Sequence, residues 1–340
     1  MNKIFKHPVI IIIILTIVPS ALLILILSSN PILSFYAFVT GPFSNVYSFG
    51  NMLNNAAPLM LTSLGAFIAL KSNSFNLGGE GQVYLGATIT GILSIYLNNT
   101  IGVFTLPFII IVALFTSGIL TWISAWLEIK YRVNSLISTY LLSMTIIHIC
   151  NYFVTGPFLM EGSNILTTSK INKSYYLPKI LEPSALSAGF LIALILVIII
   201  SLYLKNTLWG YEFTISGKNR VFAESMGIKS LNYRVAGLTI SGVLHGAAGV
   251  ILVLGNHHSV IVGINNNLGW NGLSSALLAG SRPIMVIISS LFYSFLDAGS
   301  SYATITSDVT IELSQIIKSV LFFVISSRLI KDKFIKRGIE

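Results

Sequence analysis

The residues of this sequence with the greatest potential for chemistry are amides and a carboxylate set between long apolar stretches. The segment 75–82 reads FNLGGEGQ and contains Asn76, Glu80 and Gln82. Amides both donate and accept hydrogen bonds, and a carboxylate adds acceptors, so the set suits hydroxyl groups and the edges of nucleobases. An acid at membrane depth is costly unless it is paired or lines water, so we predict that Glu80 lines a solute path. The structural alternative is that Glu80 caps the helix that begins there.

Asparagines and a tryptophan form a second candidate set. Asn54 and Asn55 precede Pro58 in one apolar stretch, and Asn271 follows Trp270 in another. An aromatic face beside an amide can stack on a base or sugar and hydrogen-bond to it. We therefore predict that these residues line a pore. Buried asparagines can instead hold membrane helices together, and that alternative stays open.

Three further charged residues lie in apolar stretches near the C-terminus. Asp297 and Lys318 fall in adjacent predicted antiparallel helices, and we expect them to form an ion pair that lowers the desolvation cost of both. Glu312 lies in the same helix as Lys318. A proton relay through Glu80, Asp297 and Glu312 would instead indicate an ion-driven secondary transporter.

Other reaction chemistries find little support in the sequence. Cys150 is the only cysteine, so an intrachain disulfide or a cysteine-rich metal site is excluded. Adjacent histidines point in different directions on a helix and lack a nearby acid, so we expect no metal at His257 and His258. The sequence contains no Walker A, Gly-x-Ser-x-Gly or HExxH motif, which argues against an ATPase, hydrolase or zinc protease, and a membrane-embedded enzyme would lack an assembled catalytic set.

The composition indicates a membrane protein. The chain has 340 residues, of which 54% are hydrophobic and 9% are charged, outside the range of soluble domains. A membrane span takes about 20 helical residues. We predict one all-α polytopic domain over residues 1–340, with an uncleaved first helix and ten spans near 9–28, 51–70, 81–97, 104–127, 135–154, 185–204, 234–254, 260–280, 283–302 and 310–327. For 260–280, a segment that re-enters the membrane without crossing it is the alternative.

The basic residues predict the orientation. The net charge of +9 comes mainly from lysines and arginines at helix ends and in alternate loops. Cytoplasmic loops carry the excess of these residues, which predicts that both termini and the loop 205–234 are cytoplasmic and that the loop 155–183 is outside. This pattern explains the charge without a nucleic-acid partner.

Two segments dense in glycine and polar residues interrupt the spans. They are 75–82 and 255–272, and they follow the second and seventh spans, which run in opposite directions. Transporters carry such breaks in inverted repeats, where free backbone groups face the solute near the midplane. We therefore predict inverted halves formed by spans two to five and seven to ten.

The cytoplasmic loop 205–234 contains the segment GKNRVFAESMGIKSL. Ala223 to Met226 favour a short helix, and Gly217 and Gly227 bracket it as start and stop signals. A short amphipathic helix in such a loop suits docking to another protein. An ordinary solvated loop is the alternative.

Several segments together resemble a known family, the permease subunits of nucleoside and simple-sugar ABC importers, which are related to branched-chain amino acid permeases. Asn-x-Gly-x-Glu-Gly-Gln is the most specific motif, formed here by Asn76, Gly78, Glu80, Gly81 and Gln82. It is typical of the nucleoside branch that works with basic-membrane-protein lipoproteins. The resemblance is carried by residues 56–70, 75–87, 217–230, 241–255 and 269–283.

The resemblance implies a type II importer-like bundle of about ten helices. It also implies three partners: an ABC ATPase subunit that binds ATP and Mg, a second homologous permease and an extracytoplasmic solute-binding lipoprotein. The permease itself would hold no cofactor, and its solute would be a nucleoside before a sugar or an amino acid. The loop 217–230 would be the coupling helix, with contacts to the ATPase through Arg220, Ala223, Glu224, Met226 and Gly227.

Two residues depart from the family pattern. Gly79 stands where the family usually has an alanine or an aliphatic residue, and His245 stands where a small residue is common. The first change is expected to loosen the local turn. The second places a titratable group in the seventh span.

Overall fold

The structure is a computed structural model that describes residues 22, 24–26, 28–98, 100–310, 312, 315–320 and 322–323. The predicted first span, 9–28, lies almost wholly outside these residues. Both termini and the basic tail also lie outside them. The prediction that the termini are cytoplasmic therefore remains a prediction.

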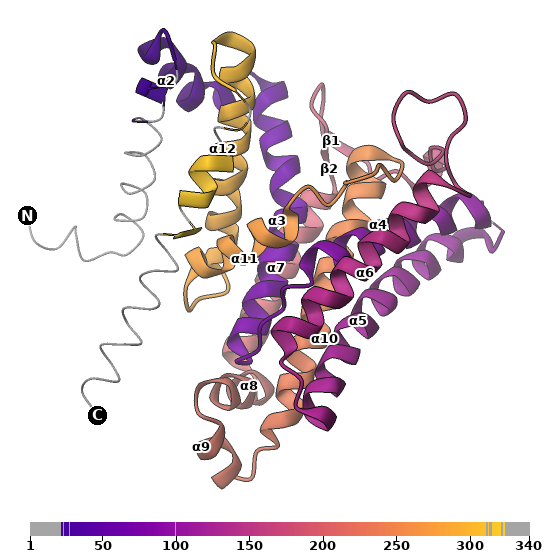
Figure 1. The fold of residues 1–340 in the computed structure, drawn as a ribbon, viewed down its shortest axis with the longest axis vertical. Helices are drawn as coiled ribbons and strands as arrows, with labels where there is room; N and C mark the ends of the chain where they lie inside the picture. The colour runs from indigo at the N-terminus through magenta and orange to yellow at the C-terminus, as the bar shows by residue number, and fades with distance from the viewer. Residues whose placement is uncertain are drawn as a thin grey trace, which may run out of the picture.

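The described chain is a bundle of helices with one small hairpin (Figure 1). This confirms the prediction of an all-α polytopic fold. The elements in chain order are α2 (Pro31–Thr40), η2 (Gly41–Phe43), α3 (Val46–Lys71), α4 (Gly79–Leu97), η3 (Gly102–Phe104), α5 (Thr105–Tyr131), α6 (Ser135–Thr155), η4 (Lys173–Tyr175), β1 (Lys179–Leu181), β2 (Leu186–Ser187), α7 (Gly189–Asn206), α8 (Leu208–Lys218), α9 (Arg220–Ser225), α10 (Ser230–Ile251), the π-helix η5 (Leu252–His257), α11 (Leu268–Ala279) and α12 (Met285–Thr306).

Five stretches of the described chain are long and apolar enough to cross a membrane: 46–71, 102–131, 135–155, 189–206 and 230–257. Helices α4 and α12 have 19 and 22 residues, so they are long enough to cross but more polar. The predicted span 260–280 is wrong in its length. Only the 12 residues of α11 are helical, about 18 Å at 1.5 Å per residue, which is too short to cross.

The two halves of the bundle repeat one contact pattern. Helices α3 and α10 pack against each other at the centre (Figure 1). Helix α10 also packs against α4 and α5, and α3 packs in the same way against α11 and α12. The breaks follow α3 and α10, so the pattern agrees with the predicted inverted halves.

Glycines let the central helices approach closely. A Cβ at Gly249 of α10 would lie 2.1 Å from the Val83 carbonyl oxygen of α4, and one at Gly86 of α4 would lie 2.4 Å from the Gly246 carbonyl oxygen of α10. Small residues at such crossings give dispersion contact between backbones, which drives helix association in lipid. The α4–α10 contact therefore depends on glycine from both sides.

The connecting segments described next lie at two opposite ends of the bundle. Helices α8 and α9 lie at one end, and β1, β2 and the loop between α6 and α7 lie at the other (Figure 1). The latter loop is fastened to the end of α10, because Ile171 N–H donates to the His258 carbonyl at 2.9 Å and Leu177 N–H donates to the Leu254 carbonyl at 2.9 Å. The two loops that the charge pattern assigned to different sides of the membrane thus lie at different ends.

Candidate functional site

In the break between α3 and α4, two side-chain amides are hydrogen-bonded to each other. Asn76 Nδ2 donates to Gln82 Oε1 and Gln82 Nε2 donates to Asn76 Oδ1, both at 2.8 Å. Asn76 also donates to Ser241 Oγ of α10 at 2.8 Å. Both side chains are buried, with exposed fractions of 4% and 1%. Asn76 and Gln82, predicted to line a solute path, are therefore engaged with each other in this structure.

Glu80 joins the two halves of the bundle. Its Oε1 accepts hydrogen bonds from Gly269 N–H at 2.8 Å and Trp270 N–H at 3.1 Å, in the first turn of α11, and its Oε2 accepts one from Asn265 Nδ2. A carboxylate at this position satisfies backbone donors and favours the positive end of the helix dipole. The alternative that Glu80 caps the helix in which it lies is wrong. Glu80 belongs to α4, but its carboxylate caps the N-terminus of α11.

The N-termini of α4 and α11 meet at this carboxylate. A Cβ at Gly269 would lie 2.5 Å from the Glu80 backbone nitrogen, so the two chains touch there backbone to backbone. Only glycine allows so close an approach. The polar breaks 75–82 and 255–272, one from each half of the bundle, thus meet at Glu80 and Gly269. We call this contact the junction.

The two departures from the family pattern contact each other. A Cβ at Gly79 would lie 2.8 Å from the His245 ring, which is 1% exposed. His245 Nδ1 lies 2.7 Å from the Ser241 carbonyl oxygen. The imidazole therefore occupies the space that a larger residue at 79 would fill, and the glycine at 79 makes room for it.

A cavity of about 670 Å³ lies beside this junction, between α3, the end of α10, α11, α12 and residues 315–322. Asn55, Trp270 and Asn271 line it, as predicted for a solute path. Trp270 is 38% exposed, so its ring is accessible from the cavity. Amide groups beside an aromatic face can hydrogen-bond and stack on a polar heterocycle or sugar.

Asn54 has a structural role, but it bonds to the hairpin and not to another helix as the alternative supposed. Its Oδ1 accepts hydrogen bonds from Ser187 N–H and Ser187 Oγ, both at 3.1 Å, and the side chain is 2% exposed. One turn earlier, Asn51 Oδ1 accepts from Ala185 N–H at 2.8 Å. Asn51 and Asn54 therefore hold residues 185–187 of the hairpin against α3. The neighbouring Asn55 lines the cavity instead.

Sequence reasoning missed part of the cavity lining. Asn256, His257, Asn266 and Asn267 also line it. All four lie in the glycine-rich break 255–272, whose density of polar residues was the available signal. Their individual directions depend on a π-helix and on left-handed residues at 266 and 267, which periodicity does not reveal.

The predicted ion pair is present at the cavity wall. Lys318 Nζ contacts Asp297 Oδ1, and both residues line the cavity. This confirms the pairing that the sequence predicted. Glu312, the third acid considered for a relay, is exposed and is not part of the cavity lining.

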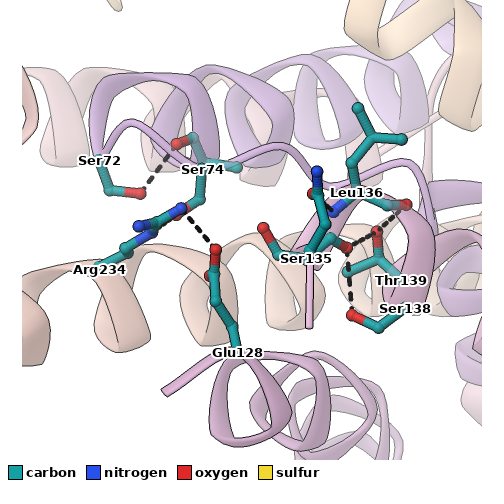
Figure 2. Close-up of polar contacts among 10 residues, drawn as sticks. Ser72, Ser74, Glu128, Ser135, Leu136, Ser138, Thr139 and Arg234 are labelled. Atoms are coloured by element: carbon teal, nitrogen blue, oxygen red, sulfur yellow. Dashed lines mark hydrogen bonds and ion pairs between the residues drawn. The ribbon is translucent and has the colours of Figure 1, made fainter. Parts of the chain in front are cut away.

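A polar cluster fixes the opposite end of the bundle, where α10 begins (Figure 2). Arg234 Nη2 contacts Glu128 Oε1 of α5 at 2.5 Å, and Arg234 Nε donates to Ser74 Oγ in the break after α3 at 3.1 Å. Thr139 Oγ1 of α6 accepts from Leu77 N–H in the same break at 3.1 Å. The break is thus tied directly to α10 and α6, and through Arg234 to α5, at the end that carries α8 and α9.

The segment predicted to dock a partner forms two helices, α8 and α9. Arg220 Nε contacts Glu224 Oε1 at 2.7 Å, and Ser230 Oγ donates to the same oxygen at 2.6 Å. The Ser230 hydroxyl and the Arg220 guanidinium hold the pKa of the Glu224 carboxyl below its ordinary value. Gly227, with φ +79°, makes the turn after α9.

One predicted contact residue of this loop needs correction. Ala223 is fully buried on the inner face of α9, so it cannot meet a partner surface in this conformation. The outward face instead carries Val221, Phe222 and Met226, with exposed fractions of 78%, 49% and 64%. An apolar face of this kind suits burial in a groove of another protein.

Residues 48–326 match the family described as the permease component of the branched-chain amino acid transport system, and the chain belongs to this family. The fold and the match define it as an ABC transporter permease of the nucleoside and simple-sugar branch, and as a multi-pass membrane protein. Among the described residues, no group of three or more histidines, cysteines or acids could hold a metal ion.

Several known permease proteins are similar to the chain over most of its length. It is 26% identical over 308 residues to the probable riboflavin import permease protein RfuC of Treponema pallidum, covering 90% of this chain and 81% of the relative. It is 25% identical over 341 residues to the guanosine ABC transporter permease protein NupP of Bacillus subtilis, covering 96% and 95%. The guanosine ABC transporter permease protein NupQ of the same bacterium is 26% identical over 256 residues, covering 71% of this chain and 77% of the relative. No solved structure matches the chain.

Proposed function

We propose that the chain is the permease subunit of an ABC importer that carries a nucleoside across the inner membrane of a bacterium. The observation that carries the proposal is the cavity beside the α4–α11 junction. Its wall combines Trp270 with several side-chain amides. Amide donors and acceptors match the edge of a nucleobase, and an indole face matches its ring. The guanosine permease NupP supports the same solute class.

The charges of the cavity favour a neutral solute. Lys318 and Asp297 neutralise each other at the wall, and the remaining polar lining is mainly amide. A net charge on the solute would therefore lose its hydration without gaining an unpaired partner of opposite sign. Nucleosides and riboflavin both combine a heterocycle with hydroxyl groups, and a simple sugar has only the hydroxyl groups.

The proposal includes partners for this chain. The exposed apolar face of α9 suits an ABC ATPase subunit, which would bind ATP and Mg and hydrolyse the ATP. The similarity to both NupP and NupQ of one bacterium favours a second, homologous permease beside this one. An extracytoplasmic lipoprotein would deliver the solute to the end of the bundle that carries β1 and β2.

The ion-driven alternative is less well supported by the geometry. A relay needs acids that can release and rebind protons, but Glu80 accepts three hydrogen bonds and Asp297 is paired with Lys318. Uptake by an ABC importer should stop when ATP is depleted, and it should persist when the proton gradient alone is collapsed.

The test of the solute is uptake of radiolabelled guanosine in a strain from which the gene is deleted. We expect uptake to be lost in the deletion strain and restored by the gene on a plasmid. Unlabelled purine nucleosides should compete, whereas glucose should not. Equal uptake in the deletion and parent strains, with riboflavin or glucose uptake lost instead, would refute the nucleoside assignment and leave the permease assignment in place.

A further inference from the structure

A second pocket lies at the end of the bundle that carries α8 and α9, far from the cavity beside the junction (Figure 1). It has a volume of about 560 Å³, within the range of small-molecule sites, and it lies between α8, the turn after α9 and the start of α10. Its lining combines aromatic rings, an amide and charges of both signs. The residues that matter here are Trp209, Glu212, Gly227, Lys229, Asn232 and Tyr233.

Regular spacing brings the charged and aromatic groups of this pocket together. Trp209 and Glu212 are three residues apart in α8, and Lys229, the N-cap of α10, precedes Tyr233 by four residues, so each pair shares one side of its helix. The Tyr233 hydroxyl donates to Glu212 Oε2, and the centroids of the Trp209 and Tyr233 rings lie 5.6 Å apart. A carboxylate, an ammonium group and two aromatic rings therefore line one space.

The polar groups of the pocket are within reach of a ligand. Lys229 and Asn232 are exposed, and Trp209, Glu212 and Tyr233 are half-buried. The ion pairs among the described residues include neither Lys229 nor Glu212. Each of the two charges is therefore available to a ligand group of opposite sign.

The pocket lies at the depth of lipid headgroups. The membrane-crossing stretch Gly189–Asn206 ends three residues before Trp209, and the stretch Ser230–His257 begins directly after Lys229. The pocket is thus at the boundary between hydrocarbon and water. Tryptophan and tyrosine are enriched at this boundary because one end of each ring system is apolar and the other is polar.

Exposed apolar residues continue from the pocket along α7. The Tyr203 ring lies 5.6 Å from the Trp209 ring and the residue is 48% exposed. Leu208, at the start of α8, is 73% exposed. Apolar side chains at this depth face the acyl chains of the bilayer. A molecule with its polar head in the pocket therefore finds apolar surface for its chains next to it.

We propose that the pocket binds the headgroup of a zwitterionic phospholipid from the leaflet at this end, with the ammonium group at Glu212 and the phosphate at Lys229. The rings of Trp209 and Tyr233 add a cation–π attraction for the ammonium group, which choline and ethanolamine headgroups both carry. Phosphatidylglycerol has no ammonium group and would leave Glu212 without an opposite charge. A nucleoside lacks both charges. The proposed solute therefore has no part in this site, which is an addition to the proposed function.

The first test measures which phospholipid the permease retains. The intact permease is placed in nanodiscs with equal parts of phosphatidylcholine, phosphatidylethanolamine and phosphatidylglycerol, and the lipids that stay bound after transfer to detergent are identified by native mass spectrometry. The wild-type protein should retain the two zwitterionic lipids over phosphatidylglycerol by about tenfold. Equal retention of all three lipids, or a preference for phosphatidylglycerol, would overturn the inference.

A double variant tests whether the two charges cause the preference. Glu212→Gln with Lys229→Gln should abolish it, and the glutamine at 212 still has an oxygen for the Tyr233 hydroxyl, so the wall of the pocket is kept. The matched control is Glu161→Gln with Lys173→Gln, which makes the same changes at exposed positions in the loop between α6 and α7 and should keep the preference. An unchanged preference in the Glu212 and Lys229 variant would refute the site.

A second test leaves both charges in place. Asn232→Cys puts an exposed thiol in the pocket, and the native Cys150 is buried. Alkylation of Asn232→Cys should be slower in phosphatidylcholine nanodiscs than in phosphatidylglycerol nanodiscs. Ser225→Cys, exposed at the end of α9 and outside the pocket lining, should react equally in both. Equal rates for Asn232→Cys in the two lipids would contradict the proposal.

Other occupants of the pocket would give different results. If guanosine slows the alkylation of Asn232→Cys and phosphatidylcholine does not, the pocket is a nucleoside site and the inference is wrong. If an added ATPase subunit slows it to the same extent in both lipids and the lipids have no effect, the pocket is a protein contact and the inference is also wrong. None of these measurements uses transport, so they hold whichever solute the permease carries.

Discussion

Glu80 is the residue on which the junction between the two halves depends. Its carboxylate accepts from Gly269 N–H and Trp270 N–H through one oxygen and from Asn265 Nδ2 through the other. In Glu80→Gln the amide oxygen can replace only one of these two acceptors, because the amide nitrogen then faces the Asn265 donor. We expect uptake to fall at least about tenfold, with the complex still assembled, because the helix that carries Trp270 is loosened.

A compensating variant tests that explanation. In Glu80→Gln with Asn265→Asp, the new carboxylate can accept from the glutamine amide, so the contact is rebuilt with donor and acceptor exchanged. Recovery of part of the uptake supports a positioning role for Glu80. Normal uptake by Glu80→Gln alone would show that neither its charge nor its second acceptor matters.

Gly79 and His245 form the second testable pair at this scale. Gly79→Ala places a methyl group 2.8 Å from the His245 ring, closer than van der Waals contact. Overpacking of this kind costs about 1–3 kcal/mol, so the thermal unfolding temperature of the purified permease should fall. In Gly79→Ala with His245→Ala the clash with the ring is removed, while the contact of the new methyl group with Gly269 Cα at 2.9 Å remains. The loss should therefore be smaller than the sum of the two single losses but not absent. Strict additivity would show that the two positions are independent.

Residue types were easier to predict from the sequence than residue partners. The Asp297–Lys318 pair was predictable because two opposite charges in adjacent apolar helices have few other ways to lower their desolvation cost. The partners of Asn54 and Asn76 were not predictable, because an amide can bond equally well to a solute, a loop or another amide. Which one it meets depends on the register of helices that are distant in sequence.

At the scale of elements, α9 carries the docking hypothesis. Val221, at 78% exposure, is the most exposed apolar residue of α9, and Ala223 points inward. Val221→Arg should abolish solute-stimulated ATP hydrolysis, because it places a charge on the apolar face that a partner groove would bury. The matched control, Val221→Leu, keeps the face apolar and should retain most activity. Both variants should insert in the membrane at wild-type levels.

Ala223→Arg should give a different result from Val221→Arg. A buried alanine cannot become arginine without displacing α9, so the loop itself should become sensitive to protease. Protection of the loop in Val221→Arg, together with loss of ATPase co-purification, would identify an interface defect. Wild-type co-purification and normal uptake in Val221→Arg would remove the coupling assignment.

The cluster at Arg234 shows how α9 is connected to the junction. Arg234 lies in the first turns of α10, directly after the docking loop, and it contacts Glu128 and Ser74 (Figure 2). Ser74 belongs to the same break as Asn76, which leads into Glu80. A displacement of the start of α10 would therefore reach the break through side-chain contacts, with no need for a change in the membrane-spanning part of α3.

At the scale of the whole molecule, hydropathy predicted the positions of the long apolar helices better than it predicted the structure of the polar breaks between them. The apolar stretches that became α3, α5, α6, α7 and α10 are long enough to be recognised individually. The region 260–280 was predicted to be a span because its composition is apolar, but its glycines and asparagines favour turns up to residue 267. Helix α2 was not predicted, since ten residues fall below the length of a span.

The orientation in the membrane can be tested at exposed serines on two loops. The loop between α6 and α7 and the helices α8 and α9 lie at opposite ends of the bundle (Figure 1). The charge pattern assigns the first to the outside and the second to the cytoplasm. Ser174 is exposed in the first loop and Ser225 is exposed at the end of α9, whereas Ser230 is 5% exposed and would label poorly.

The variants Ser174→Cys and Ser225→Cys, each with one introduced cysteine, can therefore report the two sides, because the native Cys150 is buried. A membrane-impermeant maleimide added to whole cells with a permeable outer envelope should modify Ser174→Cys and leave Ser225→Cys unmodified. After the inner membrane is opened with detergent, both should react, which shows that Ser225→Cys is accessible and was protected only by its side of the membrane. Labelling of Ser225→Cys but not Ser174→Cys in intact cells would reverse the orientation, and with it the side on which an ATPase could dock.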